Sequence, residues 1–307
     1  MTEHIIVTDE DQTHTITMRP YIAMSDATDT AQSNPSIRCL IITGRSGVFT
    51  AGNDIADFLQ AATTTYDVAR PKNAVIFLQS PVQNTKPIIA AVDGIAIGIG
   101  TTMVFHCDYV VASTTTTFSS PFIQYGLVPE GASSLLLPRM VGHQRAFSML
   151  VMGRPISADD ARAAGFVNTV VPPGHAVVEA QKVAREICAL PAEAVAIARK
   201  LLKLSTEDLI RRIGQEDHFF GERMRSPEAI DDIGMAAAGR IGAPITRNVS
   251  LRDSTSRRCR ARRDTAGHYA VIPGATMETW SPLSPPRSTR HSEIGRASCR
   301  ERVFSSV

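Results

Sequence analysis

The sequence predicts an α/β protein in which strands are connected by helices and a helical segment follows at the C-terminal end. Two apolar runs, Ile37–Thr43 and Pro87–Val92, are typical of buried strands, and each leads through a glycine-rich turn into a helix start. From residue 176 to residue 225 the pattern is helical. These observations favour a sheet with connecting helices, followed by a helical region.

The N-terminal elements are a hairpin and a helix. His4–Thr8 and Thr13–Met18 alternate in strand fashion about a polar turn, which predicts an opening hairpin. Helical spacing begins at Tyr21 and ends near Asn34, before the strand Ile37–Thr43.

The middle of the chain alternates between helices and strands. We predict a helix over Asp67–Val82, a helix over Thr101–Cys107, a strand over Tyr109–Ala112 and a polar turn region over Thr114–Ser120. Further helices are predicted at Ser133–Val141, Gln144–Met152, Ala158–Ala164 with Ser157 as N-cap, Ala176–Leu190, Ala192–Leu204 and Glu207–Arg225.

The composition indicates a chain with enough apolar residues for a sizeable core. The 307 residues are 43% hydrophobic and carry a formal net charge of +2. No segment is apolar for long enough to cross a bilayer and the first residues lack a signal-peptide pattern, so we expect a cytoplasmic protein. The five cysteines are scattered without C-x-x-C spacing, which argues against disulfides and against a metal site.

The C-terminal segment differs in composition from the rest of the chain. Residues 241–307 contain 12 arginines, no lysine and 5 acidic residues. An arginine-rich arm for nucleic acid or membranes is one interpretation, but the segment lacks helical periodicity and interleaved aromatic residues. We therefore interpret residues 241–307 as a non-native or disordered arginine-rich tail, and we expect neither a nucleic-acid nor a membrane partner.

Two glycine-rich turns are the most informative local motifs. Phe49–Asp54, FTAGND, follows the strand Ile37–Thr43, and Asp93–Gly100, DGIAIGIG, follows the strand Pro87–Val92. Backbone N–H groups at such helix starts favour an anionic group or a polarised carbonyl oxygen. The glycine spacing does not fit G-x-G-x-x-G and no Gly-Lys-Ser/Thr follows, so a nucleotide phosphate site is disfavoured.

These two motifs, in this order and at this spacing, resemble the enoyl-CoA hydratase/isomerase (crotonase) superfamily. The resemblance extends from about His4 to Pro227. It implies a crotonase-like spiral of ββα units over residues 1–190 that binds an acyl-CoA thioester, and a C-terminal helical trimerisation region over residues 191–240. Relatives have a coenzyme-holding loop before the first helix, whereas here Arg19-Pro20 leads directly into Tyr21.

The resemblance also implies an oxyanion hole for the thioester oxygen. Its two backbone N–H donors correspond to Asn53 and Ile99, where the identity of the side chain matters little. The other substrate-binding positions implied by the resemblance are Ala51, Gly52, Asp54, Ile55, Gly98, Gly100, Phe122 and Leu127.

The carboxylates distinguish between the reactions of this superfamily. Its hydratases use two glutamates, and the matching positions here are Thr102 and Phe122, neither of which can act as a general acid or base near neutral pH. Glu130 stands in the run Pro129–Ser134, PEGASS, which resembles the peroxisomal-type Δ3,Δ2-enoyl-CoA isomerases with their single catalytic glutamate. The alternative is a solvated glutamate that opens the helix at Ser133.

Other polar residues have simpler interpretations. His106 lies among apolar residues and is interpreted as a packed core histidine. No Gly-x-Ser-x-Gly elbow surrounds Ser133 and Ser134, which favours capping or packing over nucleophilic catalysis. Lys200 or Lys203 can reach a coenzyme phosphate in one interpretation, and a solvated helix face is the other.

The function predicted from these residues is the isomerisation of a 3-enoyl-CoA to a 2-enoyl-CoA. Glu130 moves the proton while the N–H groups of Asn53 and Ile99 stabilise the enolate. We expect no cofactor beyond the coenzyme A of the substrate, no metal, and a homotrimer or a dimer of trimers. The alternatives are a hydratase, lyase or hydrolase of the same superfamily, and a non-catalytic acyl-CoA binding protein.

Overall fold

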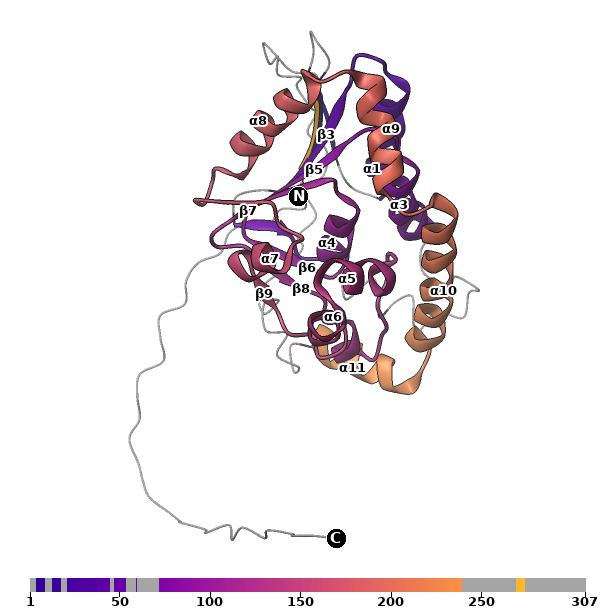
Figure 1. Ribbon diagram of the computed structural model, residues 1–307. Coiled ribbons are helices and arrows are strands. Elements are labelled where there is room, and N and C mark those ends of the chain that lie inside the picture. The colour runs from indigo at the N-terminus through magenta and orange to yellow at the C-terminus, as the bar shows by residue number, and fades with distance from the viewer. Residues whose placement is uncertain are drawn as a thin grey trace, which may run out of the picture.

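The computed structural model describes residues 4–8, 13–17, 21–44, 47–53, 59, 72–238 and 269–273. Within these residues the chain forms two sheets with helices packed around them (Figure 1). The predicted α/β class is therefore confirmed.

The larger sheet has the strand order β10-β7-β5-β3-β11-β1-β2. Its members are β1 (His4–Thr8), β2 (Thr13–Thr17), β3 (Cys39–Thr43), β5 (Ile88–Val92), β7 (Tyr109–Ser113), β10 (Thr169–Val171) and β11 (Tyr269–Pro273). The strands from β10 to β11 run parallel, and β1 is antiparallel to both of its neighbours. The pairing of β1 with β2, with His4 opposite Thr17, confirms the predicted hairpin.

The smaller sheet contains β4 (Val48–Thr50), β6 (Ile95–Ile97), β8 (Thr117–Ser119) and β9 (Ile156–Ser157), in that order. Each of the first three follows a strand of the larger sheet after a short turn, so the pairs β3-β4, β5-β6 and β7-β8 repeat along the chain. A helix follows each of the first two pairs before the next pair begins. This is the repeated strand–strand–helix pattern that the family resemblance implies.

The prediction of a polar turn over Thr114–Ser120 was wrong for the second half of this segment. Residues Thr117–Ser119 form β8, which pairs in parallel with β6. Phe118 is fully buried there, and threonine is a β-branched residue that a strand accommodates well. The repeated hydroxyl groups suggested a loop, but pairing with a neighbouring strand decided the conformation.

The helices are α1 (Tyr21–Ser33), α3 (Lys72–Gln83), α4 (Ile99–Thr102), α5 (Ser133–Val141), α6 (His143–Leu150), α7 (Ala158–Ala164), α8 (Ala176–Cys188), α9 (Ala192–Leu202), α10 (Thr206–Met224) and α11 (Pro227–Ala237), with short 3-10 helices η1 (Met103–His106) and η2 (Phe122–Tyr125). The helix predicted over Thr101–Cys107 is divided between α4 and η1. The predicted N-cap of α7 is confirmed, because Oγ of Ser157 accepts a hydrogen bond of 3.2 Å from the N–H of Asp160.

The strand β3 of the larger sheet is buried on both faces. Leu40 and Ile42 point into the main core, whereas Cys39 and Ile41 point to the opposite face, where they pack with Ala180 and other residues of α8. Alternate residues of a strand face opposite sides, so this continuous apolar run is what a strand covered on both faces requires.

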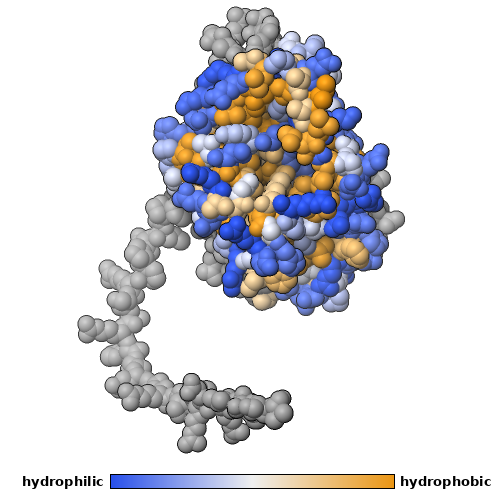
Figure 2. Space-filling view, viewed as in Figure 1, coloured by the Kyte–Doolittle hydropathy of each residue, from blue (hydrophilic) through white to orange (hydrophobic). Residues whose placement is uncertain are grey.

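The α9 helix carries apolar side chains on the surface. Ile197, Leu201 and Leu202 are 53%, 81% and 87% exposed. Figure 2 shows apolar residues gathered in the upper part of this face, including the area where α9 lies in Figure 1. No helix within the described residues is both long and apolar enough to span a membrane.

The strand β11 lies within residues 241–307, which the composition predicts to be a non-native or disordered tail. Tyr269–Pro273 lies between β1 and β3, parallel to β3 with Val271 opposite Ile41. Its sequence, YAVIP, is rich in the β-branched and aromatic residues that favour strands. The structure therefore differs from the expectation at these five residues.

Candidate functional site

The two glycine-rich turns lie side by side. The strands that precede them, β4 and β6, pair in parallel with Thr50 opposite Ala96, so both turns leave the same edge of the smaller sheet. Gly52 has a φ of +83°, and a Cβ atom placed on it would lie 2.9 Å from the carbonyl oxygen of Ile97. Only glycine allows the backbone of the first turn to approach the second this closely.

The second turn opens directly into α4. Gly98, with φ 56° and ψ −120°, is the N-cap, and Ile99 is the first helical residue and is 4% exposed. The first N–H groups of a helix have no acceptor within the helix, and they lie at the positive end of its dipole. The N–H of Ile99 is thus one of the groups that can receive an oxygen atom from outside the helix.

Glu130 is fully buried, with 0% of the residue exposed. It lies in the loop between η2 and α5, which passes against α4, because a Cβ atom placed on Gly131 would lie 3.3 Å from Oγ1 of Thr102. The interpretation of Glu130 as a solvated first-turn residue is therefore wrong. The fold brings the loop that carries Glu130 against the helix that begins with Ile99.

His106 contacts the same loop from η1. Its Nε2 atom lies 2.7 Å from the carbonyl oxygen of Gly131, and the residue is 3% exposed. Burial lowers the pKa of His106 to about 4, although the hydrogen bond to Gly131 acts in the opposite direction. The ring is therefore neutral near pH 7, and because a carbonyl oxygen only accepts, Nε2 carries the hydrogen atom. The prediction of a packed core histidine is confirmed.

Glu216 of α10 contacts the loop one residue further on. Its Oε2 accepts a hydrogen bond of 2.5 Å from the N–H of Ala132, and its Oε1 accepts bonds from the N–H and the hydroxyl of Ser134 at 3.0 Å and 2.5 Å. Burial raises the pKa of Glu216, while its bonds to Ser134 and Ala132 and the charge of Arg212 lower it. This carboxyl group caps the start of α5 from outside the helix. The N-cap residue, Ala132, cannot do so because it has no polar side chain.

Phe122 and Leu127 form the apolar side of the site. Both are buried in a cluster with Phe220 of α10 and residues of α11. The rings of Phe122 and Phe220 pack edge to face, with their centroids 6.3 Å apart. A Cβ atom placed on Gly98 would lie 4.0 Å from Cε1 of Phe122. The C-terminal helices therefore cover the side of the site that Phe122 forms.

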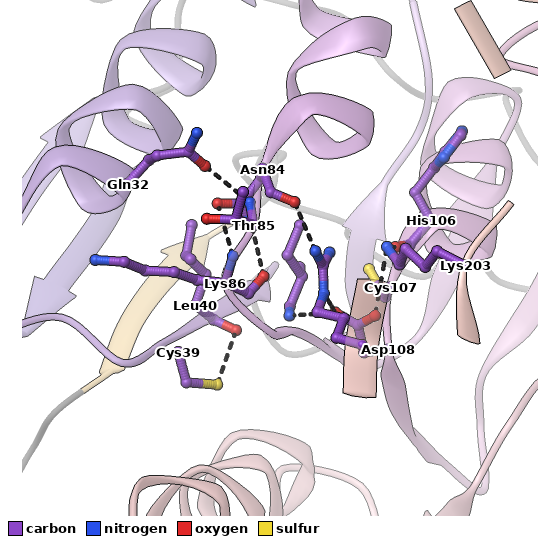
Figure 3. Close-up of polar contacts among 12 residues, drawn as sticks. Gln32, Cys39, Leu40, Asn84, Thr85, Lys86, His106, Cys107, Asp108 and Lys203 are labelled. Carbon is purple, nitrogen blue, oxygen red and sulfur yellow. Dashed lines mark hydrogen bonds and ion pairs between the residues drawn. The ribbon is translucent and has the colours of Figure 1, made fainter. Parts of the chain in front are cut away.

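A group of charged residues joins α9 to the η1–β7 connection (Figure 3). Asp108 accepts a bond of 2.7 Å from Nε of Arg199 and lies 3.4 Å from Nζ of Lys203. Lys203 also donates to the carbonyl oxygen of His106 at 2.7 Å. Burial lowers the pKa of Lys203, and the charge of Asp108 raises it. Lys203 is thus bound within the protein, whereas Lys200 is exposed.

The structure brings most of the predicted site residues together. Ala51, Gly52 and Asn53 are partly exposed at the first turn, and Gly98, Ile99 and Gly100 form the second. Asp54 and Ile55 lie outside the described residues. No group of three or more His, Cys, Asp or Glu residues is placed to hold a metal ion within the described ranges.

Glu216 is the residue that sequence reasoning missed. A signal for it was present, because Leu209, Ile213 and Phe220 form an apolar stripe along α10 at helical spacing and Glu216 falls on that same stripe. A carboxyl group on the buried face of a helix needs hydrogen-bond donors from another element.

Comparisons with known proteins agree with this geometry. A family model described as enoyl-CoA hydratase/isomerase matches residues 7–235. Rat enoyl-CoA delta isomerase 2 is 29% identical over 180 residues, which are 58% of this chain and 46% of the rat protein. Mevalonyl-coenzyme A hydratase of Beauveria bassiana is 33% identical over 175 residues, 54% of this chain and 62% of that protein. The chain thus spans about half the length of the rat protein.

Solved structures show the same fold. OdaA of Pseudomonas aeruginosa is 37% identical and superimposes with a TM-score of 0.66 over 70% of this chain and 87% of its own. A putative enoyl-CoA hydratase/isomerase of Acinetobacter baumannii is 33% identical, with the same TM-score and coverage. With a family model over residues 7–235 and these structural relatives, the chain belongs to the enoyl-CoA hydratase/isomerase family and has the crotonase fold.

Proposed function

We propose that this chain is an isomerase that converts a 3-enoyl-CoA into a 2-enoyl-CoA with Glu130 as its single catalytic base. The observation that carries the proposal is the burial of Glu130 in the loop that packs against α4, beside the two adjacent glycine turns. The rat, human and mouse relatives that bear the name enoyl-CoA delta isomerase support this choice within the family.

The proposed oxyanion hole consists of the backbone N–H groups of Asn53 and Ile99. The thioester oxygen accepts both hydrogen bonds, and these strengthen when negative charge develops on the oxygen. The partly exposed residues Ala51–Asn53 leave one side of this position open to a substrate. Removal of one such donor typically lowers kcat by about 10²- to 10³-fold.

The proposed proton transfer takes place on one carboxylate. Glu130 removes a proton from C2 of the 3-enoyl thioester, the electron pair moves toward the thioester oxygen, and the conjugated enolate forms in the oxyanion hole. The same carboxyl group then returns the proton at C4, which leaves the double bond between C2 and C3. One base is sufficient because no water molecule is added.

Hydration is the second candidate, because a mevalonyl-coenzyme A hydratase is among the relatives. That chemistry needs a second acid or base, and the two matching positions hold Thr102 and Phe122. The hydroxyl of Thr102 donates to the carbonyl oxygen of Ile99 at 3.3 Å, and Phe122 has no proton to exchange. Glu216 is buried, but its oxygens bind Ala132 and Ser134.

An assay with two substrates tests the proposal. The purified chain is incubated separately with a trans-3-enoyl-CoA and a trans-2-enoyl-CoA of the same length, and the thioesters are separated by reversed-phase chromatography. We expect conversion of the 3-enoyl to the 2-enoyl form, and a loss of kcat of about 10²- to 10⁴-fold in Glu130→Gln with retained affinity for acyl-CoA. The exposed Glu193 on α9 provides the matched control, Glu193→Gln.

Each result separates the candidate functions. A 3-hydroxyacyl-CoA that forms from the 2-enoyl substrate faster than isomerisation occurs would favour a hydratase. Acyl-CoA binding without any turnover would favour the non-catalytic alternative. An unchanged kcat in Glu130→Gln would remove Glu130 from the mechanism.

A further inference from the structure

The turn after Glu130 has a backbone conformation that Ala132 disfavours. Gly131 and Ala132 have φ angles of 68° and 57°, both in the left-handed region, and Ala132 is the one non-glycine residue with a positive φ in the part of the chain that the structure describes. A residue with a Cβ atom keeps this conformation only where surrounding groups hold it.

Two side chains hold a single peptide group in this turn. The carbonyl oxygen of Gly131 accepts from Nε2 of His106 at 2.7 Å, and the N–H of Ala132 donates to Oε2 of Glu216 at 2.5 Å. These two polar atoms belong to the same peptide group, and in a trans peptide they point in opposite directions. His106 and Glu216 therefore lie on opposite sides of the Gly131–Ala132 peptide.

The chemistry of the two side chains fixes the orientation of this peptide. A rotation of the peptide plane by half a turn would place the carbonyl oxygen beside the Glu216 carboxyl group, which already accepts two bonds from Ser134. The same rotation would point the N–H of Ala132 at Nε2 of His106, which could accept it only after the ring hydrogen atom moved to Nδ1. The two present hydrogen bonds would be lost, and the carbonyl oxygen would face the oxygens of a carboxyl group in a buried environment.

We infer that His106 and Glu216 are positioning residues that fix the Gly131–Ala132 peptide and thereby hold the backbone of Glu130 for proton transfer. The inference rests on the proposed role of Glu130. Glu216 belongs to α10, and Lys203, which follows α9, donates to the carbonyl oxygen of His106. The C-terminal helices therefore restrain the loop that carries Glu130 in two ways. Glu216 binds the loop directly, and Lys203 binds His106, which in turn binds the loop.

A positioning role and a purely structural role differ in their kinetic effects. If Glu216 only capped α5, its loss would lower the melting temperature and leave kcat of the folded enzyme unchanged. If it positions Glu130, its loss lowers kcat, because a displacement of about 1 Å can reduce the rate by about 10²-fold. The KM for acyl-CoA changes little, because neither side chain is placed at the glycine turns.

The first experiment compares two glutamates of α10. Glu216→Gln keeps the shape of the side chain but replaces one acceptor oxygen with an NH₂ group, and Glu222→Gln changes a glutamate whose side chain is 55% exposed. We expect kcat to fall by about tenfold or more in Glu216→Gln, with KM within about twofold, and no change in Glu222→Gln. A folded Glu216→Gln with the kcat of the wild type overturns the inference.

The second experiment changes His106, which lies on the opposite side of the Gly131–Ala132 peptide from Glu216. His106→Leu removes the donor to Gly131, whereas the amide of His106→Gln can restore it, so kcat should be higher in the glutamine variant. Because both side chains act on one peptide, the double variant His106→Leu/Glu216→Gln should lose less than the product of the two single effects. Losses that simply multiply overturn the inference. If Glu216→Gln folds poorly, the comparison of His106→Leu with His106→Gln still tests it, and equal kcat in these two variants overturns it.

A readout without substrate separates this inference from the proposed function. Hydrogen exchange of a peptide that covers residues 129–136 should accelerate in Glu216→Gln and His106→Leu but not in Glu222→Gln. If the wild type shows no isomerase activity while this exchange pattern appears, the proposed reaction fails and the restraint on the loop stands. Unchanged exchange in both variants overturns the restraint itself.

Discussion

Gly100 lies so close to Thr50 that no side-chain atom fits between the two turns of the site. A Cβ atom placed on Gly100 would lie 2.1 Å from Cγ2 of Thr50, with the next atoms of Thr50 at 3.3 Å and 3.4 Å. Gly100 has an ordinary helical φ, so glycine is required here for space and not for its backbone freedom. The spacing of the proposed oxyanion donors depends on this contact.

Gly100→Ala should therefore destabilise the protein, and Thr50→Ser should rescue it. Overpacking of a buried contact typically costs about 1–3 kcal/mol in the free energy of unfolding. Serine removes the clashing Cγ2 but keeps the hydroxyl that accepts from the N–H of Gly52 at 3.1 Å. Urea unfolding of both single variants and of the double variant measures the effect. A double variant as unstable as Gly100→Ala would contradict the contact.

The backbone donors can be tested with proline at Ile99. This residue is the first of α4, a position where proline is tolerated, so Ile99→Pro removes the N–H without breaking the helix. We expect kcat for a 3-enoyl-CoA to fall by about 10²- to 10³-fold. Asn53→Ala keeps its N–H and should retain most of the activity. Circular dichroism checks the fold, and normal turnover in a folded Ile99→Pro would exclude the Ile99 donor.

Burial of His106 predicts a loss of stability in acid. Its pKa is about 4 in the folded protein and 6.5 in the unfolded chain, so the unfolded state binds the proton first as the pH falls. The contribution of His106 to the free energy of unfolding should decrease by about 1.4 kcal/mol per pH unit between about pH 6.5 and pH 4.

The difference between the wild type and His106→Gln isolates this effect. Glutamine does not titrate, so the slope of stability against pH in this window should be smaller in the variant. The raised pKa of Glu216 acts with the opposite sign, because stability falls as the pH rises through its titration, and it is present in both proteins. Equal slopes in urea unfolding from pH 4 to pH 7 would show that His106 titrates normally.

The exposed apolar side chains of α9 provide a test of the predicted homotrimer. Leu201 and Leu202 are 81% and 87% exposed, which is unusual for large apolar residues that remain in water. If copies of the chain associate through this helix, Leu201→Glu should lower the molar mass measured by light scattering. Lys200→Glu, an exposed change on the same helix, is the control. A monomeric wild type would contradict the prediction.

The sequence by itself determined the order of most elements. The hairpin, the helix from Tyr21, the two strands before the glycine turns and the C-terminal helices were predicted because their hydrophobic periodicity is local. The glycine turns were also visible, because a tight approach such as that of Gly52 to Ile97 requires glycine at a fixed place in the chain. The family followed from these motifs.

Local patterns did not predict β8 or the placement of β11. Both are short strands that are stabilised by pairing with segments far away in the sequence, β6 for the first and β1 and β3 for the second. A threonine-rich run and an arginine-rich segment contain no local sign of these partners, because strand pairing depends on neighbours in space.

The environment of Glu130 was decided only by the tertiary structure. The sequence marked the residue through its motif, but left open whether the side chain was solvated or buried. Burial arises where the loop packs against α4, and the restraint of the next peptide comes from His106 on η1 and Glu216 on α10. These hydrogen bonds join residues that are distant in the chain, and periodicity within one element carries no information about a partner in another.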